Sequence, residues 1–325
     1  MGYLDSTYTS GVIAAREKYL LKEKIYRLCE VSAEEAFRVL LECNYGGGAE
    51  RAHSVYEYEK LVEAEESAVD SFIREYAPSQ ALVAYLLSPR DFHNAKAFLK
   101  AYHLGENAEK MLAPQGLIEI EELERAVKEK DFSSLSAYPL LQSACVEGVT
   151  LLEEDGSGAK LGVIFEKALY THLYQTVKRN RMLKTLLNKK IDMTNILIAL
   201  RAGEEENALN KYLPYGNLKN DRLSTLFESD LEKSLQAFKG TEYFEFVKVC
   251  LQAKERGLPF TEAEKILASA DRAFFAERKY ELHKQEPFLY YVYRRRTENA
   301  NVRIVFACLL AGLSEQAIKN RLRNE

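Results

Sequence analysis

Three places in the chain carry an acidic residue followed three positions later by an asparagine. They are Asp91 with Asn94, Asp192 with Asn195, and Glu298 with Asn301. One hypothesis is that these polar side chains form an inward-facing ring with a functional role. The alternative is structural: each acid caps a helix, and each asparagine amide satisfies backbone groups of a neighbouring helix. Recurrence favours the structural interpretation, because a packing requirement repeats with the fold whereas a catalytic requirement usually does not.

The densest basic cluster is Arg294-Arg295-Arg296, followed by Arg303. These guanidinium groups are candidates for contacts with acidic loops of a partner protein or with lipid headgroups. The alternative is that the cluster marks a helix end, where cations complement the helix dipole, with salt bridges to Glu298.

Other residues that could carry chemistry lack the spacing that the chemistry needs. Gly46-Gly47-Gly48 is not followed by the G-K-[ST] of a phosphate-binding loop, so we interpret it as a flexible connection between helices. The five histidines form no H-E-x-x-H motif, and the five cysteines form no C-x-x-C pair. Acidic runs such as Glu63-Ala64-Glu65-Glu66 are typical of solvated helix faces. We therefore expect no catalytic residue, no metal site and no cofactor.

Composition limits the class of protein. The chain has 325 residues, is 47% hydrophobic and 29% charged, and carries a net charge of −4, which excludes a disordered chain and gives no reason to expect nucleic-acid binding. The longest apolar run, residues 304–313, is half of the ~20 residues that span a bilayer. The first residues lack the pattern of a secretory signal, and the odd, scattered cysteines are typical of a reduced cytoplasmic protein.

The spacing of apolar residues predicts an all-α fold. Long stretches contain neither glycine nor proline, and residues 163–202 show one apolar stripe at helical spacing, which predicts a single helix. Ser88-Pro89-Arg90-Asp91 has the pattern of a helix start with proline in the first turn. Gly312 followed by Ser314-Glu315 predicts that one helix ends and a last short one begins, with Ala317, Ile318 and Leu322 facing inward.

The elements that position the acid and asparagine pairs recur about every 100 residues. Asp91 and Asp192 lie 101 positions apart, and Glu298 follows 106 positions later. Pro114-Gln115-Gly116 recurs as Pro214-Tyr215-Gly216, a shift of 100, whereas no proline marker follows Asn301. The repeat predicts three similar helical modules, residues 1–113, 114–213 and 214–325, with the N-terminal helices packing with the third module.

Together these residues resemble the C-type subunits of archaeal and bacterial A/V-type ATPases, the counterparts of the eukaryotic V-ATPase d-type subunits. The matching pieces cover most of the chain. They are the N-terminal helix from Ala15 to Leu21, the segment Leu40 to Tyr45, the acid and asparagine pairs, and the block from Glu298 through Gly312 to Glu315.

The resemblance implies three alike helical bundles arranged as a funnel with pseudo-threefold symmetry. It implies a non-catalytic rotor subunit, present in one copy, that links the central-shaft subunits (D/F type) to the membrane proteolipid ring and transmits torque for ion transport coupled to ATP hydrolysis or synthesis. The implied location is the cytoplasmic face of the membrane, without a membrane span.

Two other functions remain as alternatives. One is a helical scaffold for unrelated partners, although its repeats would be expected every 34–47 residues rather than about every 100. The other is an all-α enzyme whose site is assembled from residues that lie far apart in the sequence.

Overall fold

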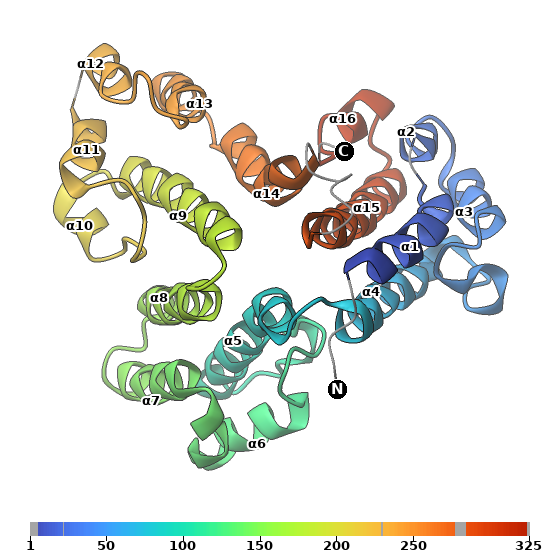
Figure 1. Cartoon of the computed structure of the whole chain (residues 1–325), viewed down its shortest axis with the longest axis horizontal. Coiled ribbons are helices and arrows are strands. Elements are labelled where there is room, and N and C mark those ends of the chain that lie inside the picture. Colours follow the sequence, from blue (N-terminus) through green and yellow to red (C-terminus); the bar gives the residue numbers. More distant parts are fainter. Residues whose placement is uncertain (1–5, 22, 229, 277–283, 324–325) are drawn as a thin grey trace. The chain divides into compact units, whose positions relative to one another are not determined.

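The computed structural model describes residues 6–21, 23–228, 230–276 and 284–323 (Figure 1), and in these ranges the chain forms helices and no strand. The α-helices are α1 Ser6–Arg16, α2 Lys24–Leu28, α3 Ala33–Glu42, α4 Tyr58–Tyr76, α5 Gln80–Leu104, α6 Ile120–Glu129, α7 Pro139–Glu154, α8 Gly158–Val177, α9 Arg181–Ala202, α10 Glu205–Leu209, α11 Asn220–Ser224, α12 Leu231–Gln236, α13 Phe244–Glu255, α14 Thr261–Ala276, α15 Glu286–Leu310 and α16 Glu315–Lys319. Short 3-10 turns are η1 Glu17–Tyr19, η2 Tyr45–Glu50, η3 Val55–Glu57, η4 Glu109–Met111, η5 Ser133–Ala137 and η6 Thr225–Phe227. The predicted all-α class is confirmed.

The chain divides into two compact units. Unit 1 combines residues 1–80 with residues 268–325, and unit 2 comprises residues 81–267. Segments from both ends of the sequence therefore share one core in unit 1. The three modules and their funnel arrangement stay a prediction.

Unit 1 is built around α15, which packs against α4, α1, α2, α3 and α16 (Figure 1). Aromatic rings join α4 to α15: Tyr58 stacks on Phe306 with ring centroids 5.0 Å apart, and Phe72 stacks on Phe288 at 5.4 Å. Stacked aromatic pairs of this kind add about 1 kcal/mol beyond the apolar area that they bury.

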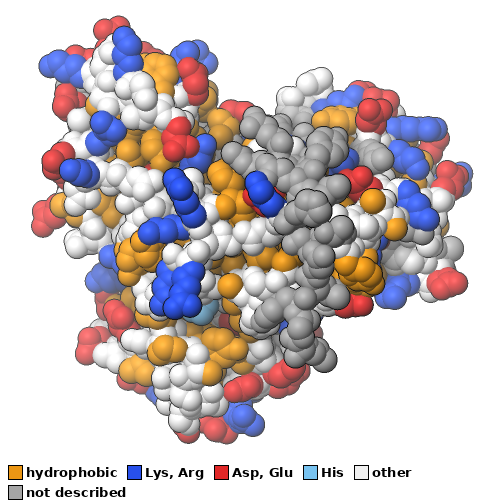
Figure 2. All heavy atoms as spheres, viewed as in Figure 1, with side chains coloured by type: hydrophobic (Ala, Val, Ile, Leu, Met, Phe, Trp, Pro, Cys, Tyr) orange, Lys and Arg blue, Asp and Glu red, His pale blue; other side chains and the backbone are white. Residues whose placement is uncertain are grey.

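Unit 2 is a succession of helices in which α7 packs on α8 and α8 on α9. One of its hydrophobic clusters contains Phe92, Leu99, Leu141 and Phe165. Gly148 lets α7 approach α8 closely, because a Cβ atom at this position would lie 2.8 Å from Cδ1 of Leu161. Charged side chains of both signs are scattered over the face of the molecule drawn in Figure 2.

Two predictions of helix boundaries are wrong. Residues 163–202 form α8 and α9 rather than one helix, because Asn180 has an extended backbone and its Oδ1 accepts a hydrogen bond of 3.1 Å from the Leu183 N–H. The expected helix start at Ser88-Pro89 lies inside α5. Proline inside a helix costs about 3 kcal/mol, and burial of apolar residues on both sides, such as Leu87 and Phe92, offsets this cost.

The glycine-rich segment is an ordered turn instead of a flexible connection. Gly46 and Gly47 lie in η2 with φ of 60° and 86°. A Cβ atom on Gly46 would lie 2.2 Å from the Leu61 carbonyl oxygen, so only glycine fits here.

The predicted end of the chain is largely confirmed. Helix α15 ends at Leu310, Gly312 has a φ of 70°, and Ser314 caps α16 by accepting a hydrogen bond from the Ala317 N–H. Ile318 and Leu322 are buried, whereas Ala317 is half-buried.

Candidate functional site

The three repeated asparagines lie inside long helices, α5, α9 and α15, and do the same thing in each. All three are buried, and each side-chain amide makes two hydrogen bonds to the backbone of a single residue, with its Nδ2 donating to the carbonyl and its Oδ1 accepting from the N–H. The pairs are Asn94 with Ala113 (3.1 and 2.8 Å), Asn195 with Leu213 (3.0 and 2.8 Å) and Asn301 with Arg323 (3.1 and 2.8 Å). The amide thereby holds a returning segment of chain against the helix. We call this arrangement the amide clamp.

The acids of the first two copies hold the next part of the same segment. Asp91 accepts hydrogen bonds of 2.9–3.1 Å from the N–H groups of Leu117 and Ile118. Asp192 accepts bonds of 3.0 and 2.9 Å from the N–H groups of Asn217 and Leu218. Both acids are almost fully buried and lie in the interior of their helices, so neither caps its own helix.

The acids explain the glycine of the repeated Pro-x-Gly marker. A Cβ atom on Gly116 would lie 2.3 Å from a carboxylate oxygen of Asp91, and one on Gly216 would lie 2.4 Å from a carboxylate oxygen of Asp192. The chain can wrap over the carboxylate only because these residues have no side chain. The repeat is therefore one structural unit: the asparagine and the acid bind backbone groups on either side of the Pro-x-Gly marker, and its glycine leaves room for the acid.

The third copy is more complete than the missing proline indicates, but its acid binds a different part of the chain. Asn301 clamps Arg323 although no proline follows Arg323. Glu298 accepts a hydrogen bond of 2.5 Å from the N–H of Leu21, a residue 277 positions earlier. The N-terminal segment therefore supplies the backbone donor that the following loop supplies in the first two copies.

A tyrosine lies beside each acid. The Tyr243 hydroxyl donates to Asp192 at 2.6 Å, and the Tyr45 hydroxyl donates to Asn299, next to Glu298, at 2.8 Å. Burial, and after it the nearby carboxylate of Glu298, raises the pKa of Tyr45; burial and Asp91 act in the same way on the pKa of Tyr138.

The acid Asp192 itself has a raised pKa. Burial is the largest cause, and it exceeds the opposing effect of the hydrogen bonds from Tyr243, Leu218 and Asn217. The asparagines satisfy backbone groups, as the structural interpretation of the repeat expects. The helix caps that it expects from the acids are wrong, because all three acids lie inside their helices.

The basic residues predicted as partner contacts lie in the middle of α15, so the helix-end interpretation is wrong. Arg295 is 5% exposed and forms ion pairs with Glu65 and with Glu298, the latter at 2.5 Å. Arg303 forms ion pairs with Glu59 and Glu66 of α4, both at 2.5 Å. The predicted salt bridge to Glu298 is present.

The other two predicted contacts, Arg294 and Arg296, are half-buried on the same helix. The interpretation of Glu63-Ala64-Glu65-Glu66 as a solvated helix face is wrong for Glu65 and Glu66, which pair with Arg295 and Arg303. Glu59 and Glu66 lie seven residues apart, about two helical turns, so they are on the same face of α4 and both reach Arg303.

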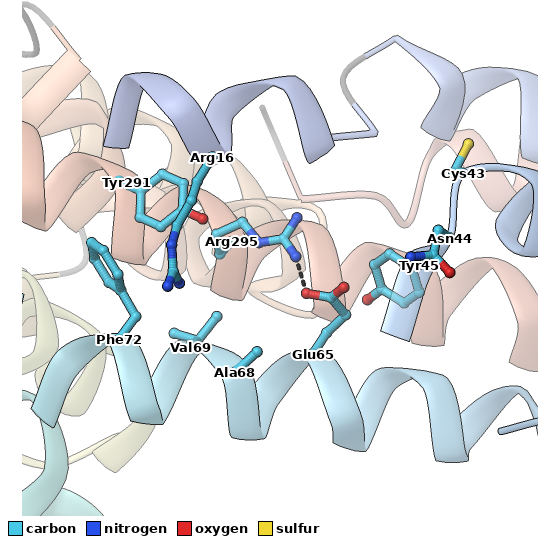
Figure 3. A pocket seen from close by; sticks show the side chains of 10 residues that line it. All are labelled: Arg16, Cys43, Asn44, Tyr45, Glu65, Ala68, Val69, Phe72, Tyr291 and Arg295. Carbon is cyan, nitrogen blue, oxygen red and sulfur yellow. Dashed lines mark hydrogen bonds and ion pairs between the residues drawn. The ribbon is translucent and has the colours of Figure 1, made fainter. Parts of the chain in front are cut away.

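A pocket of about 370 Å³ opens beside this ion cluster in unit 1 (Figure 3). Figure 3 shows Arg295 from α15 pointing at Glu65 of α4, with Arg16 at the Phe72 side of the pocket. The guanidinium of Arg16 lies 5.0 Å from the centroid of the Phe72 ring, a cation–π contact that attaches the N-terminal helix to α4. Glu65 also accepts a 2.9 Å hydrogen bond from the Gly46 N–H, so all three charged side chains of the pocket, Arg16, Glu65 and Arg295, have contacts within the unit.

The described ranges of the chain contain neither a candidate metal site nor a helix that could span a membrane. No group of three or more His, Cys, Asp or Glu residues there could hold a metal ion. In those ranges, too, every helix is too short or too polar to cross a bilayer.

Comparison with known proteins assigns the chain to a family. No curated protein matches it. The model of the family described as ATP synthase (C/AC39) subunit matches residues 9–321, which is nearly the whole chain, and this agrees with the resemblance in the sequence. The chain therefore belongs to the ATP synthase (C/AC39) subunit family, which comprises the C-type and d-type subunits of V/A-type ATPases.

Proposed function

We propose that the chain is a non-catalytic central-stalk subunit of a rotary A/V-type ATPase. In this role it is a socket that links the central shaft to the membrane proteolipid ring and transmits torque between them. The family match over residues 9–321 is the observation that carries the proposal.

The internal structure of each unit supports a torque-bearing role. A part that transmits torque must resist shear between its helices and loops. The amide clamps Asn94, Asn195 and Asn301 tie returning segments to helix interiors with two hydrogen bonds each. At about 1 kcal/mol net for each bond, and more for the buried groups that would otherwise be left unpaired, these contacts are costly to open.

The proposed partners are shaft subunits of the D/F type and the proteolipid ring, bound by one copy of the chain at the cytoplasmic face of the membrane. Arg295 and Arg303 bind carboxylates of their own unit. Of the predicted contact residues we therefore propose Arg294 for a carboxylate of a partner.

The test is reconstitution with purified components. The full-length chain is mixed with the shaft subunits and, separately, with the detergent-solubilised proteolipid ring, and each mixture is analysed by size-exclusion chromatography at low and moderate salt. We expect co-migration with both, weakened by Arg294→Glu but not by Arg256→Glu, a charge reversal at an exposed position of unit 2. Separate elution from both partners at either salt concentration would overturn the proposal.

A further inference from the structure

The junction between α8 and α9 is strongly basic although the chain is acidic overall. Residues 167–191 contain seven Lys or Arg residues and no Asp or Glu, whereas the net charge of the chain is −4. The first acid after this stretch, Asp192, is fully buried, so its charge is not on the surface.

Four of these basic residues surround the turn itself. Helix α8 ends at Val177 and α9 begins at Arg181. Lys178, Arg179 and Arg181 are exposed and Lys184 is half-buried. Among the described residues none of the four has an ion-pair partner, whereas Lys189, further along α9, pairs with Glu242 at 2.9 Å.

Two tyrosine rings lie beside one of these basic residues, Lys184. The ammonium of Lys184 lies 5.0 Å from the ring centroid of Tyr174, a residue of α8 four positions before Lys178. The ring of Tyr174 stacks on that of Tyr215 with centroids 4.1 Å apart. We call this surface the basic turn patch, and its members are Lys178, Arg179, Arg181, Lys184, Tyr174 and Tyr215.

Tyr215 is the unusual member of the patch. It is 42% exposed and has a φ of 72°, a left-handed backbone conformation that residues other than glycine rarely adopt. The backbone thus holds an aromatic ring at the surface, stacked on the Tyr174 ring that Lys184 contacts. Figure 2 shows Lys and Arg side chains gathered over the region where α8 and α9 meet.

The chemistry of the patch favours an anionic lipid surface over a protein as its partner. Specific protein interfaces are centred on apolar or aromatic anchors that become fully buried. Here the contact groups are long cations around a turn, with Tyr215 the one large apolar side chain of the patch that is exposed. Clusters of Lys and Arg bind anionic headgroups through charge alone, and tyrosine rings lie at the level of the headgroups.

We propose that the basic turn patch binds a membrane surface rich in anionic phospholipid headgroups. Each Lys or Arg near such a surface strengthens binding about fivefold, so three charges contribute roughly 100-fold. The proposal does not depend on the rotor function, because it rests on the charges and exposure of unit 2 alone.

The experiment is vesicle co-sedimentation of the full-length chain. Vesicles contain phosphatidylcholine alone or phosphatidylcholine with phosphatidylglycerol. The test variant is Lys178→Gln/Arg179→Gln/Arg181→Gln. The matched control is Lys233→Gln/Lys239→Gln/Arg256→Gln, which removes the same charge from exposed positions of the same unit. Circular dichroism and thermal unfolding are measured for both variants to check that each is folded.

We expect the unaltered chain and the control to bind the anionic vesicles and not the neutral ones, with binding that weakens as salt is added. The test variant should bind roughly 100-fold more weakly. Equal binding to neutral vesicles, or an equal loss in both variants, would overturn the proposal. The proposal would also be overturned if the unaltered chain does not bind the vesicles and the test variant no longer co-migrates with the partner subunits, because the patch would then be a protein contact.

Discussion

Replacing Asn195 by alanine should destabilise unit 2, because it opens one amide clamp. The side chain of Asn195 is 4% exposed, donates to the Leu213 carbonyl at 3.0 Å and accepts from the Leu213 N–H at 2.8 Å. Leu213 is also 4% exposed, so water cannot readily replace the lost partner. Each buried backbone group left unpaired costs about 1–3 kcal/mol. Two such groups lower the free energy of unfolding by roughly 3 kcal/mol.

The loss is measured by urea unfolding followed by circular dichroism, and located by hydrogen exchange of peptides that contain Leu213. Exchange at this N–H should accelerate in Asn195→Ala while other helices of unit 2 keep their protection. The control is Asn207→Ala, since Asn207 is exposed on α10 and hydrogen-bonds only to Glu204 in the described structure. If Asn195→Ala costs no more than this control, a change within about 0.5 kcal/mol, the clamp does not hold the segment.

The isosteric substitution Asn195→Asp makes the loss of stability depend on pH. Asn195→Asp places a carboxylate oxygen opposite the Leu213 carbonyl oxygen. Burial and this oxygen disfavour the charged form, so the pKa of the new carboxyl in the folded chain lies above its unfolded value of about 3.9. An acid with a raised folded-state pKa weakens folding above that pKa, and the loss disappears as pH falls through the folded and then the unfolded pKa. The stability difference from the unaltered chain should therefore shrink as pH is lowered from 7 towards about 4, and a constant difference would contradict this reasoning.

Three further predictions follow from the same contacts. Gly116→Ala should lower the free energy of unfolding by about 1–3 kcal/mol, because the new methyl group meets a carboxylate oxygen of Asp91. Gly162→Ala, at a position of α8 with open space around it, should raise the free energy of unfolding by up to about 1 kcal/mol. Equal effects of the two substitutions in urea unfolding would refute the close approach of Gly116 to Asp91. Arg295→Met should lower the free energy of unfolding by about 3–5 kcal/mol, because it leaves the buried carboxylates of Glu65 and Glu298 unpaired, whereas Arg294→Met should lower it much less. Thermal unfolding that ranks the two variants in the opposite order would disprove the ion-pair cluster. Burial raises the pKa of Cys145 to about 12, so iodoacetamide at pH 8 should label it only after unfolding, and mass spectrometry showing rapid labelling of the folded chain would contradict its burial.

Local patterns predicted the helices well, and their failures have local physical causes. At Asn180 the apolar stripe continues across a turn, since Phe165 and Leu173 of α8 and Leu183 of α9 are all buried. At Pro89 the residues have the signature of a helix start, but burial of the flanking side chains keeps α5 continuous. At Pro89 packing therefore overrides a local signal worth about 3 kcal/mol, whereas at Asn180 a local N-cap ends the helix that the apolar stripe predicts.

The repeat was visible in the sequence, but the role of each of its members was not. Spacing alone identified Asp91, Asn94 and Gly116 and their equivalents. It did not show that the glycine makes room for the acid, because that depends on two segments crossing in space. The basic turn patch had a signal in the sequence, a run of 25 residues without an acid, but only the structure shows which of its cations are exposed.

The order of residues alone determined that this protein is helical and that acid and asparagine recur about every 100 positions, because apolar periodicity and residue identity are local properties. Tertiary structure decided which backbone groups those side chains hold. It brought Leu21 to Glu298 and Glu65 to Arg295, pairs separated by 277 and 230 positions. A buried charge or amide must find a partner wherever the folded chain offers one, and no local pattern specifies that place.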